Sequence, residues 1–403
     1  MNLLLVNPVH PSTPHISGVR AWRFACELAG MGHRVMLLTA IAPGSDRAPP
    51  PAPDLHDWRE PLIVAPAEFG GLASASRFGA LRKIRTLWQM LRHGGYHAAW
   101  ANAAVTAGKQ LAPVFPPHVV WTTVGKMESA FVARRLSRSL GIPWVLDLKD
   151  NWELYVPPPL RAVMAWRVSG WSAVTANAGS TARDARRWHH ADPRIVYSGV
   201  DDAFFRPAAT PAAGQDEGFV VNLIGSLYFP DRLEELLRGI DHWSRRLPEA
   251  DRERVEVRYI GGDAAMFQQA VQAVSLGVRA HAGGYVAIEE MASAARAAAV
   301  NMYVTHQGSF HHKLLELLAS GRPVLAYPGE SDESRALAAQ VGGELIEPGD
   351  CEGVARALDT LHRDWCSDRR RPAHSADRTP ALRYSWNAQT RLLEEVLLHA
   401  ARQ

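Results

Sequence analysis

A lysine and a glutamate three residues apart stand near the start of an expected helix, just before a glycine and a short apolar strand. They are Lys313 and Glu316 in FHHKLLELLASGRPVLAYPGE, residues 310–330. Side chains at i and i+3 share one face of a helix, so the two charges are expected to lie together. A cation near a helix N-terminus opposes the macrodipole and favours an anion or acid close by. The pair is either a solvated helix edge or part of a ligand site.

Serine and glycine precede two expected helices, where a bare backbone can approach an anion at the helix N-terminus. Ser17 and Gly18 end the long loop of residues 7–22, and Gly308 and Ser309 stand just before the helix described above. The first pair is equally consistent with an ordinary helix cap. The first loop has neither GxGxxG nor GKS/GKT spacing, which disfavours Rossmann dinucleotide binding and P-loop phosphoryl transfer.

A third loop, IGSLYFPDRLEELL, joins a buried strand to a helix over residues 224–237. Gly225 and Ser226 make a small turn at the strand end, and Arg232 follows in the first turn of the helix. A turn, a hydroxyl and a guanidinium in this arrangement suit a phosphate. The alternative is that Arg232 is an exposed side chain paired with a nearby glutamate.

Three histidines near the same helix raise the question of a metal site. Adjacent His311 and His312 point in different directions on a helix, and His306 stands apart from them in sequence. Neither HxxxH nor a carboxylate at ligand spacing accompanies them, so no metal site is expected.

The candidate loops belong to two series of short apolar strands that alternate with amphipathic helices. Each series predicts an open parallel sheet with helices on both faces, and ligands bind such sheets at the carboxyl ends of the strands. The predicted fold class is therefore α/β with two doubly wound halves. The expected strands are residues 2–7, 34–40, 97–103, 118–124, 142–148, 172–178 and 194–201, then 219–228, 255–262, 278–283, 299–306 and 322–328.

A stretch rich in Pro, Ala and Gly, residues 206–218, separates the two series and is the predicted linker. The expected domains are an N-terminal domain over 1–205 and a C-terminal domain over 219–380. An amphipathic helix follows within 381–403.

Composition restricts the function only a little. The 403 residues contain 44 basic and 41 acidic side chains, so no strong net charge points to nucleic acid. Cys26, Cys351 and Cys366 lack CxxC spacing, which disfavours a disulfide framework or structural zinc and fits a reducing cytoplasm. Pro8 cuts the apolar N-terminal run short and no stretch of 18 apolar residues follows, so neither a secretion signal nor a membrane span is expected.

Residues 78–95, FGALRKIRTLWQMLRHGG, have an apolar stripe with basic residues around the other side. A helix with this pattern either packs its stripe on a core or lies on an anionic membrane surface. Both interpretations stay open, and the second adds peripheral contact with the inner membrane face to a cytoplasmic location.

Six stretches, taken in order and spacing, resemble a glycosyltransferase of family 4 with the GT-B fold over nearly the whole chain. They are LLLVNP…SGVRAWRFACELAGMGHRVMLLTA, ARRLSRSLGIPWVLDLKDNW, RIVYSGVDDAFFRP, IGSLY, VRYIGGD and KLLELLASGRPVLAYPGE. The chain is most similar to the branch with Lys-x-x-Glu before GRPVLA. The acidic residue that usually stands eight positions before this glutamate is Gly308 here.

The resemblance implies two Rossmann-like domains that face a cleft, with the C-terminal helix, residues 385–401, crossing back to the first domain. The first domain is expected to bind the acceptor, either lipid-linked or polysaccharide material or a small natural product. The second domain is expected to bind a nucleotide-diphosphate sugar.

The resemblance also assigns a donor site. Glu316 is expected to accept hydrogen bonds from the ribose hydroxyls, because an ionised carboxylate is an acceptor only. Lys313 and Arg232 are expected to neutralise the diphosphate. The other donor-binding residues are Ser17, Gly18, Gly225, Ser226, Gly308 and Ser309 near the phosphates, and Gly262, Tyr285 and Val286 near the base.

Members of this family retain the anomeric configuration, which implies front-face attack while the leaving phosphate takes the acceptor proton; no protein nucleophile is then needed. Lys313 and Arg232 would replace Mg²⁺, so neither a metal nor a cofactor beyond the donor is expected. Asp150, at a strand end in LDLKDNW, either faces the sugar or acceptor or caps the helix that follows.

Two other functions share this architecture. A nucleotide-sugar 2-epimerase would use His10, His15 and Asp150 as acids and bases and would change the sugar without an acceptor. A catalytically impaired nucleotide-sugar-binding subunit would account for Gly308 and would bind donor without turnover. The fold alone does not choose among the three.

Overall fold

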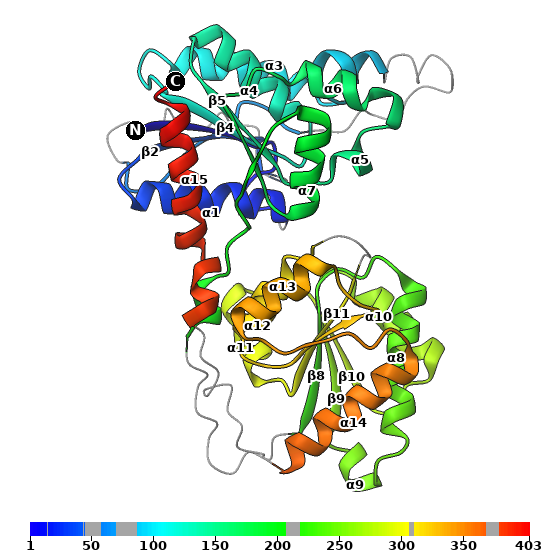
Figure 1. Cartoon of the computed structure of the whole chain (residues 1–403). Helices are drawn as coiled ribbons and strands as arrows, with labels where there is room; N and C mark the ends of the chain where they lie inside the picture. The colour runs from blue at the N-terminus through cyan, green and yellow to red at the C-terminus, as the bar shows by residue number, and fades with distance from the viewer. Residues whose placement is uncertain are drawn as a thin grey trace. The chain divides into compact units, whose positions relative to one another are not determined.

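The computed structural model describes residues 1–13, 15–42, 44, 58–69, 87–206, 218–305, 310–367 and 379–403. The chain divides into two compact units, each with its own parallel sheet (Figure 1). Unit 1 is Met1–Gly199 together with Trp386–Gln403, and unit 2 is Val200–Ser385. Most of the predicted linker, residues 207–217, lies outside the described residues.

The sheet of unit 1 has seven strands in the order β3-β2-β1-β4-β5-β6-β7. Its strands are β1 (Asn2–Val6), β2 (Arg34–Leu38), β3 (Leu62–Val64), β4 (Val119–Val124), β5 (Trp144–Leu148), β6 (Ala173–Ala176) and β7 (Arg194–Ile195). Its helices are α1 (Ile16–Gly30), α3 (Ala98–Leu111), α4 (Glu128–Leu140), α5 (Trp152–Tyr155), α6 (Arg161–Arg167), α7 (Gly179–Asp184) and α15 (Trp386–Ala400), with short turns η1 (Pro158–Leu160) and η2 (Ala185–His189).

Alternation along β1 explains how one apolar run serves two cores. Successive strand residues point to opposite faces of a sheet. Leu4 and Val6 pack in one cluster with residues of α3, α4 and α6, whereas Leu3 and Leu5 pack in the other with α1 and α15 (Figure 1). A strand that is buried on both faces reads as a continuous apolar sequence, as NLLLV does.

The C-terminal helix α15 returns to unit 1, as predicted. Its first residue, Trp386, meets Phe24 of α1 edge to face with ring centroids 5.2 Å apart. Leu393 and Leu397 are buried in the same cluster, and Glu394 Oε1 lies 2.7 Å from His33 Nε2. One face of the unit 1 sheet is therefore completed by residues from the far end of the sequence.

A buried ion pair fixes α1 to the ends of two strands. Arg20 donates from Nε and Nη2 to the Asp147 carboxylate of β5, at 3.0 and 2.9 Å, and both side chains are fully buried. Arg20 also donates to Ser198 Oγ and to the Val196 carbonyl, and Thr175 Oγ1 donates to Asp147. The guanidinium thereby holds the first strand-to-helix loop in place.

The sheet of unit 2 has six strands in the order β10-β9-β8-β11-β12-β13. They are β8 (Phe219–Ile224), β9 (Val255–Ile260), β10 (Arg279–Gly283), β11 (Val300–Val304), β12 (Val324–Tyr327) and β13 (Leu345–Ile346). The helices are α8 (Pro230–Ser244), α9 (Glu249–Arg252), α10 (Ala264–Val274), α11 (Ile288–Ala297), α12 (Lys313–Ala319), α13 (Asp332–Val341) and α14 (Cys351–Ser367), with turns η3 (Asp202–Phe204) and η4 (Thr379–Tyr384). Helices α8, α10 and α14 cover one face, and α11, α12 and α13 lie on the other (Figure 1).

The predicted strand at 97–103 is wrong, because this segment begins helix α3. Alternating alanines imitate a strand over a short window, but Trp100, Ala101, Ala104 and Val105 are buried with the spacing of one helix face. Alanine is also the strongest helix former. The pattern missed β3 and β13, and the other expected strands are present with mostly shorter bounds.

The segment proposed for membrane contact is described only from residue 87, and 87–93 are helical. Leu91 packs against the core of unit 1, while Leu87 and Trp88 are exposed. Within the described ranges, none of the helices is both long and apolar enough to cross a membrane. Peripheral contact stays a prediction.

Candidate functional site

The predicted pair Lys313 and Glu316 lies at the carboxyl edge of the unit 2 sheet. Lys313 Nζ donates to Glu316 Oε2 at 2.8 Å, and His312 Nε2 lies 3.4 Å from Glu316 Oε1. The Glu316 side chain is only 8% exposed, whereas that of Lys313 is 34% exposed. The pair is therefore a buried carboxylate with a half-buried cation above it, not a solvated helix edge.

Opposing effects set the protonation of Glu316. Burial alone raises the pKa of its carboxyl, but the neighbouring Lys313 and His312 outweigh burial and lower the pKa to about 2. The side chain is thus ionised at neutral pH and acts only as a hydrogen-bond acceptor.

This lowered pKa predicts a loss of stability in acid. A carboxyl group with a lower pKa in the folded protein than in the unfolded protein stabilises the fold at pH values above the unfolded pKa. This stabilisation is lost as the pH falls toward the folded pKa of about 2. Between pH 6 and pH 3 the wild type should lose about 2 kcal/mol more unfolding free energy than Glu316→Gln. Urea unfolding at the two pH values measures the difference, and equal losses in both proteins would contradict the low pKa.

The turn after β8 lies against the stem of Lys313. Gly225 has φ +114°, a conformation that favours glycine, and a Cβ at this position would stand 3.9 Å from Lys313 Cγ. Tyr259 donates its hydroxyl to the Gly225 carbonyl at 2.8 Å. Ser226 follows and is exposed. The structure therefore places Gly225 against the stem of the lysine, with Ser226 next in the turn.

The residues predicted near a base occupy the two neighbouring loops. The ring of Tyr285 lies against Gly262, because a Cβ added to this glycine would stand 2.8 Å from the Tyr285 hydroxyl. Tyr285 is exposed, and Val286 beside it is half-buried. Asp263 accepts from the Leu227 N–H at 2.9 Å, which ties this loop to the one after β8.

Arg232 points to the end of β11. Its Nη1 donates to the Thr305 carbonyl at 2.8 Å, and its guanidinium lies 4.7 Å from the ring centre of Phe229. Among the described residues Arg232 forms no ion pair with a glutamate; Glu234 pairs with Arg238, and Glu235 accepts from Tyr327. Gly308 and Ser309 lie outside the described residues.

Glu330, at the end of GRPVLAYPGE, has a buried side chain to which the sequence assigned no role. Tyr303 donates its hydroxyl to Glu330 Oε1 at 2.5 Å, and His311 Nδ1 lies 3.5 Å from the same oxygen. Ser331 N–H donates to Oε2 at 2.9 Å. The signal in the sequence that could have identified Glu330 is its position directly after a buried strand.

In unit 1, Ser17 and Gly18 form the first turn of α1. Their N–H groups donate to Nδ1 and the carbonyl of the N-cap residue His15, at 3.1 and 3.0 Å. A Cβ on Gly18 would stand 2.9 Å from the His10 carbonyl, so this glycine permits a close approach of two backbone segments. An anion here would compete with His15 for both donors.

Asp150 lies close to the Ser17 side chain at the carboxyl end of the unit 1 sheet. Both side chains lie beside Gly125, because a Cβ added to this glycine would stand 2.8 Å from Ser17 Oγ and 3.1 Å from Asp150 Oδ2. Lys149 Nζ donates to Asp150 Oδ1 at 2.9 Å. The helix-cap interpretation of Asp150 is wrong, because Asn151 accepts the capping hydrogen bonds of α5.

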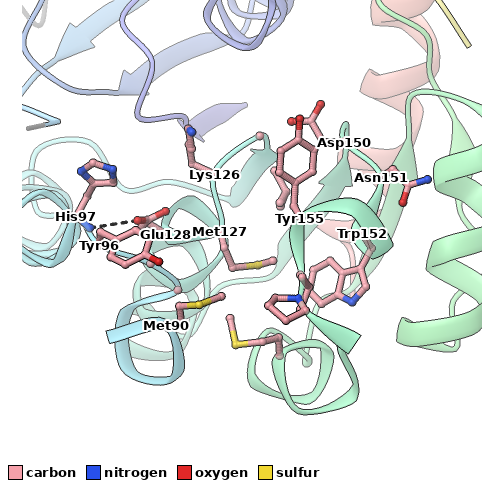
Figure 2. A pocket seen from close by; sticks show the side chains of 17 residues that line it. Met90, Tyr96, His97, Lys126, Met127, Glu128, Asp150, Asn151, Trp152 and Tyr155 are labelled. Atoms are coloured by element: carbon pink, nitrogen blue, oxygen red, sulfur yellow. Dashed lines mark hydrogen bonds between the residues drawn. The ribbon is translucent and has the colours of Figure 1, made fainter. Parts of the chain in front are cut away.

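A cavity of about 300 Å³ opens beside Asp150 within unit 1 (Figure 2). Its lining comes from residues 90, 94–97, 124–128, 150–152, 155–157 and 164. Sequence reasoning missed it, because these segments are distant in the chain and, apart from Asp150, none was a site candidate.

Two family models match the chain and decide the family. The model for glycosyl transferases group 1 matches residues 218–364, and that for a glycosyl transferase 4-like domain matches residues 17–199. The chain is a GT-B glycosyltransferase that resembles family 4. Together the matches span most of both units of this transferase.

Solved structures share the fold of the transferase at low identity. HepE of Anabaena, in complex with UDP and glucose, has a TM-score of 0.66 and 16% identity, with 99% of each chain covered. Sucrose-phosphate synthase from Thermosynechococcus elongatus has a TM-score of 0.69 and 16% identity, covering 98% of this chain and 97% of its own. A comparison with curated proteins finds no match.

The arrangement in unit 2 gives the transferase a carboxylate, a cation and a glycine turn at one sheet edge. Groups of three or more His, Cys, Asp or Glu side chains placed to hold a metal ion are absent from the described part of the chain. Whether the chemistry is metal-independent stays a prediction, as do the donor-binding roles.

Proposed function

We propose that this transferase moves a sugar from a nucleotide-diphosphate sugar to an acceptor hydroxyl with retention of the anomeric configuration. The observation that carries the proposal is the Lys313–Glu316 pair beside the Gly225 turn, at the carboxyl edge of the unit 2 sheet. Ligands bind open α/β sheets at this edge. HepE in complex with UDP-glucose, a structural neighbour, supports the donor class.

In this proposal Glu316 accepts hydrogen bonds from the ribose hydroxyls, which suits an ionised and buried acceptor. Lys313 Nζ stands over it and contacts the diphosphate together with the turn at Gly225 and Ser226. The base lies against the exposed ring of Tyr285, which offers an apolar face for stacking.

The reaction follows from these positions. The bond between the anomeric carbon and the phosphate oxygen breaks as the acceptor oxygen bonds to the same face of the sugar. The acceptor proton passes to the leaving phosphate, so no protein nucleophile takes part. Lys313 and Arg232 stabilise the negative charge that develops on the diphosphate, which makes a metal unnecessary. Asp150 contacts the acceptor in unit 1.

A thermal-shift screen against UDP, GDP, dTDP, CDP and their sugars tests the donor class. One nucleotide series should raise Tm by about 5 °C or more at a hundredfold excess over Kd, because a ligand that binds only the folded state stabilises it. Lys313→Ala and Glu316→Gln should lose most of that shift. The proposal fails if no series shifts Tm, or if both variants shift as the wild type does.

Incubation with the stabilising nucleotide-sugar alone separates the alternatives. A transferase leaves the sugar unchanged or releases it slowly to water. An epimerase interconverts the sugar at C2 without an acceptor, and an impaired subunit binds the donor without releasing nucleotide.

A further inference from the structure

The cavity of unit 1 contains a buried carboxylate that the donor site does not use. Glu128, the first residue of α4, is 3% exposed and lines the cavity. Its carboxylate occupies the space that a side chain at residue 95 would need, and Gly95 leaves that space open. The sequence therefore makes room for this carboxylate beside the cavity.

Within the part of the chain that the structure describes, Glu128 has few partners. Its Oε1 accepts one hydrogen bond from the His97 N–H at 3.2 Å. Among the described residues it forms no ion pair, in contrast to Glu316, which has Lys313. Burying a carboxylate is costly unless donors or a cation compensate it. A ligand in the cavity is in a position to supply them.

Part of the remaining lining is apolar and adaptable. Met90 and Met127 lie near each other, and Trp152 and Tyr155 line another region (Figure 2). Met164 also lines the cavity. Thioethers adjust to irregular shapes, and aromatic side chains pack well against rings. A volume of about 300 Å³ is at the small end of ligand sites, which suits a compact ring system.

The two carboxylates of the cavity lie on different sides. Figure 2 shows Glu128 with Tyr96 and His97 on one side, and Asp150 with Tyr155 on the other. Asp150 is paired with Lys149, so its charge is compensated. The exposed Lys126 also lines the cavity. Among the described residues of the lining, Glu128 is therefore the acidic group that forms no ion pair, and an anionic ligand beside it would meet repulsion.

We propose that this cavity selects the acceptor. It binds a compact, neutral or cationic molecule that has an apolar ring and a group that donates a hydrogen bond to Glu128. That the ligand is the sugar acceptor rests on the proposed function, whereas the chemistry of the ligand rests on the cavity alone. A hydroxyl near Asp150 is then the group that receives the sugar.

Three probes that differ in one group test the chemistry. Tyramine carries an ammonium, tyrosol a hydroxyl, and 4-hydroxyphenylacetate a carboxylate on the same phenol ring. Saturation-transfer NMR on the full chain, without any nucleotide-sugar, should detect tyramine and tyrosol in the millimolar range. The carboxylate probe should bind at least about tenfold more weakly, because it faces Glu128.

Two variants locate the binding. Glu128→Gln should weaken tyramine by about tenfold or more while changing tyrosol less, since only the ammonium depends on the charge. Tyr155→Ala removes a side chain that is 61% exposed, so it should fold normally and weaken both probes. Glu395→Gln, an exposed glutamate on α15, is the control and should change neither.

Several results would overturn the proposal. These are equal binding of the three probes, no binding of tyramine or tyrosol, or binding unchanged in both Glu128→Gln and Tyr155→Ala. If Glu128→Gln does not fold, the Tyr155→Ala result decides. Because donor binding is measured separately with nucleotides, failure of the acceptor chemistry is distinguishable from failure of the proposed transferase function.

Discussion

Lys313→Met should lower the kcat of glycosyl transfer by about a hundredfold to a thousandfold. The substitution keeps an apolar stem of similar length against Gly225 but removes the ammonium that lies 2.8 Å from Glu316 Oε2. In the proposed mechanism this cation stabilises the leaving diphosphate, and removal of one such group from a transition-state site costs about that factor. The rate of nucleotide release at saturating donor measures it.

The control for this experiment removes a different cation from an ion pair on a helix. Arg363 on α14 pairs with Asp359 one turn away at 3.0 Å, and both are largely exposed. Arg363→Met should leave kcat within about twofold of the wild type, because exposed pairs contribute little. A Lys313→Met enzyme with wild-type kcat would show that the cation has no part in the reaction.

Arg20→Met should lower the unfolding free energy of unit 1 by about 3–5 kcal/mol. The change leaves Asp147 fully buried with a hydroxyl partner and no cation, and removing one member of a buried ion pair has a cost of this size. It also removes the hydrogen bonds to Ser198 and Val196 that hold the end of unit 1 near α1. Chemical denaturation followed by tryptophan fluorescence gives the value.

Arg186→Met provides the comparison, because Arg186 and Asp192 form a pair at 2.8 Å that is mostly exposed. Its expected cost is below about 1 kcal/mol. Similar losses in the two variants would mean that the burial of Arg20 and Asp147 does not determine their contribution. Arg20→Met combined with Asp147→Leu should recover part of the loss, since an apolar pair leaves no charge buried.

Local periodicity was enough to predict most of the fold. Strands such as β1 and β8 are short apolar runs between amphipathic helices, and the turn at Gly225 follows directly from a strand end. The same signal failed at α3, where small alanines fit both periods and only the longer window shows a helix.

The candidate site divides in the same way. Lys313 and Glu316 were predictable because three positions on a helix fix their proximity. The partners of Glu128 were not, because Gly95 and His97 reach it from another segment of the chain. Arg20 and Asp147 are 127 positions apart, and no local pattern relates them. Their proximity is a product of the sheet order, which a single sequence specifies only through the complete fold.

The insertion of unit 2 between Gly199 and Trp386 has a consequence for synthesis of the chain. Domains usually fold in the order in which they leave the ribosome. Here unit 2 is complete once residue 385 has emerged, whereas the cluster that contains Phe24 and Leu28 of α1 lacks the residues of α15 until the end of translation. The unit that is translated second is therefore the first able to finish folding, and the apolar surface that α15 covers stays open while residues 200–385 are translated.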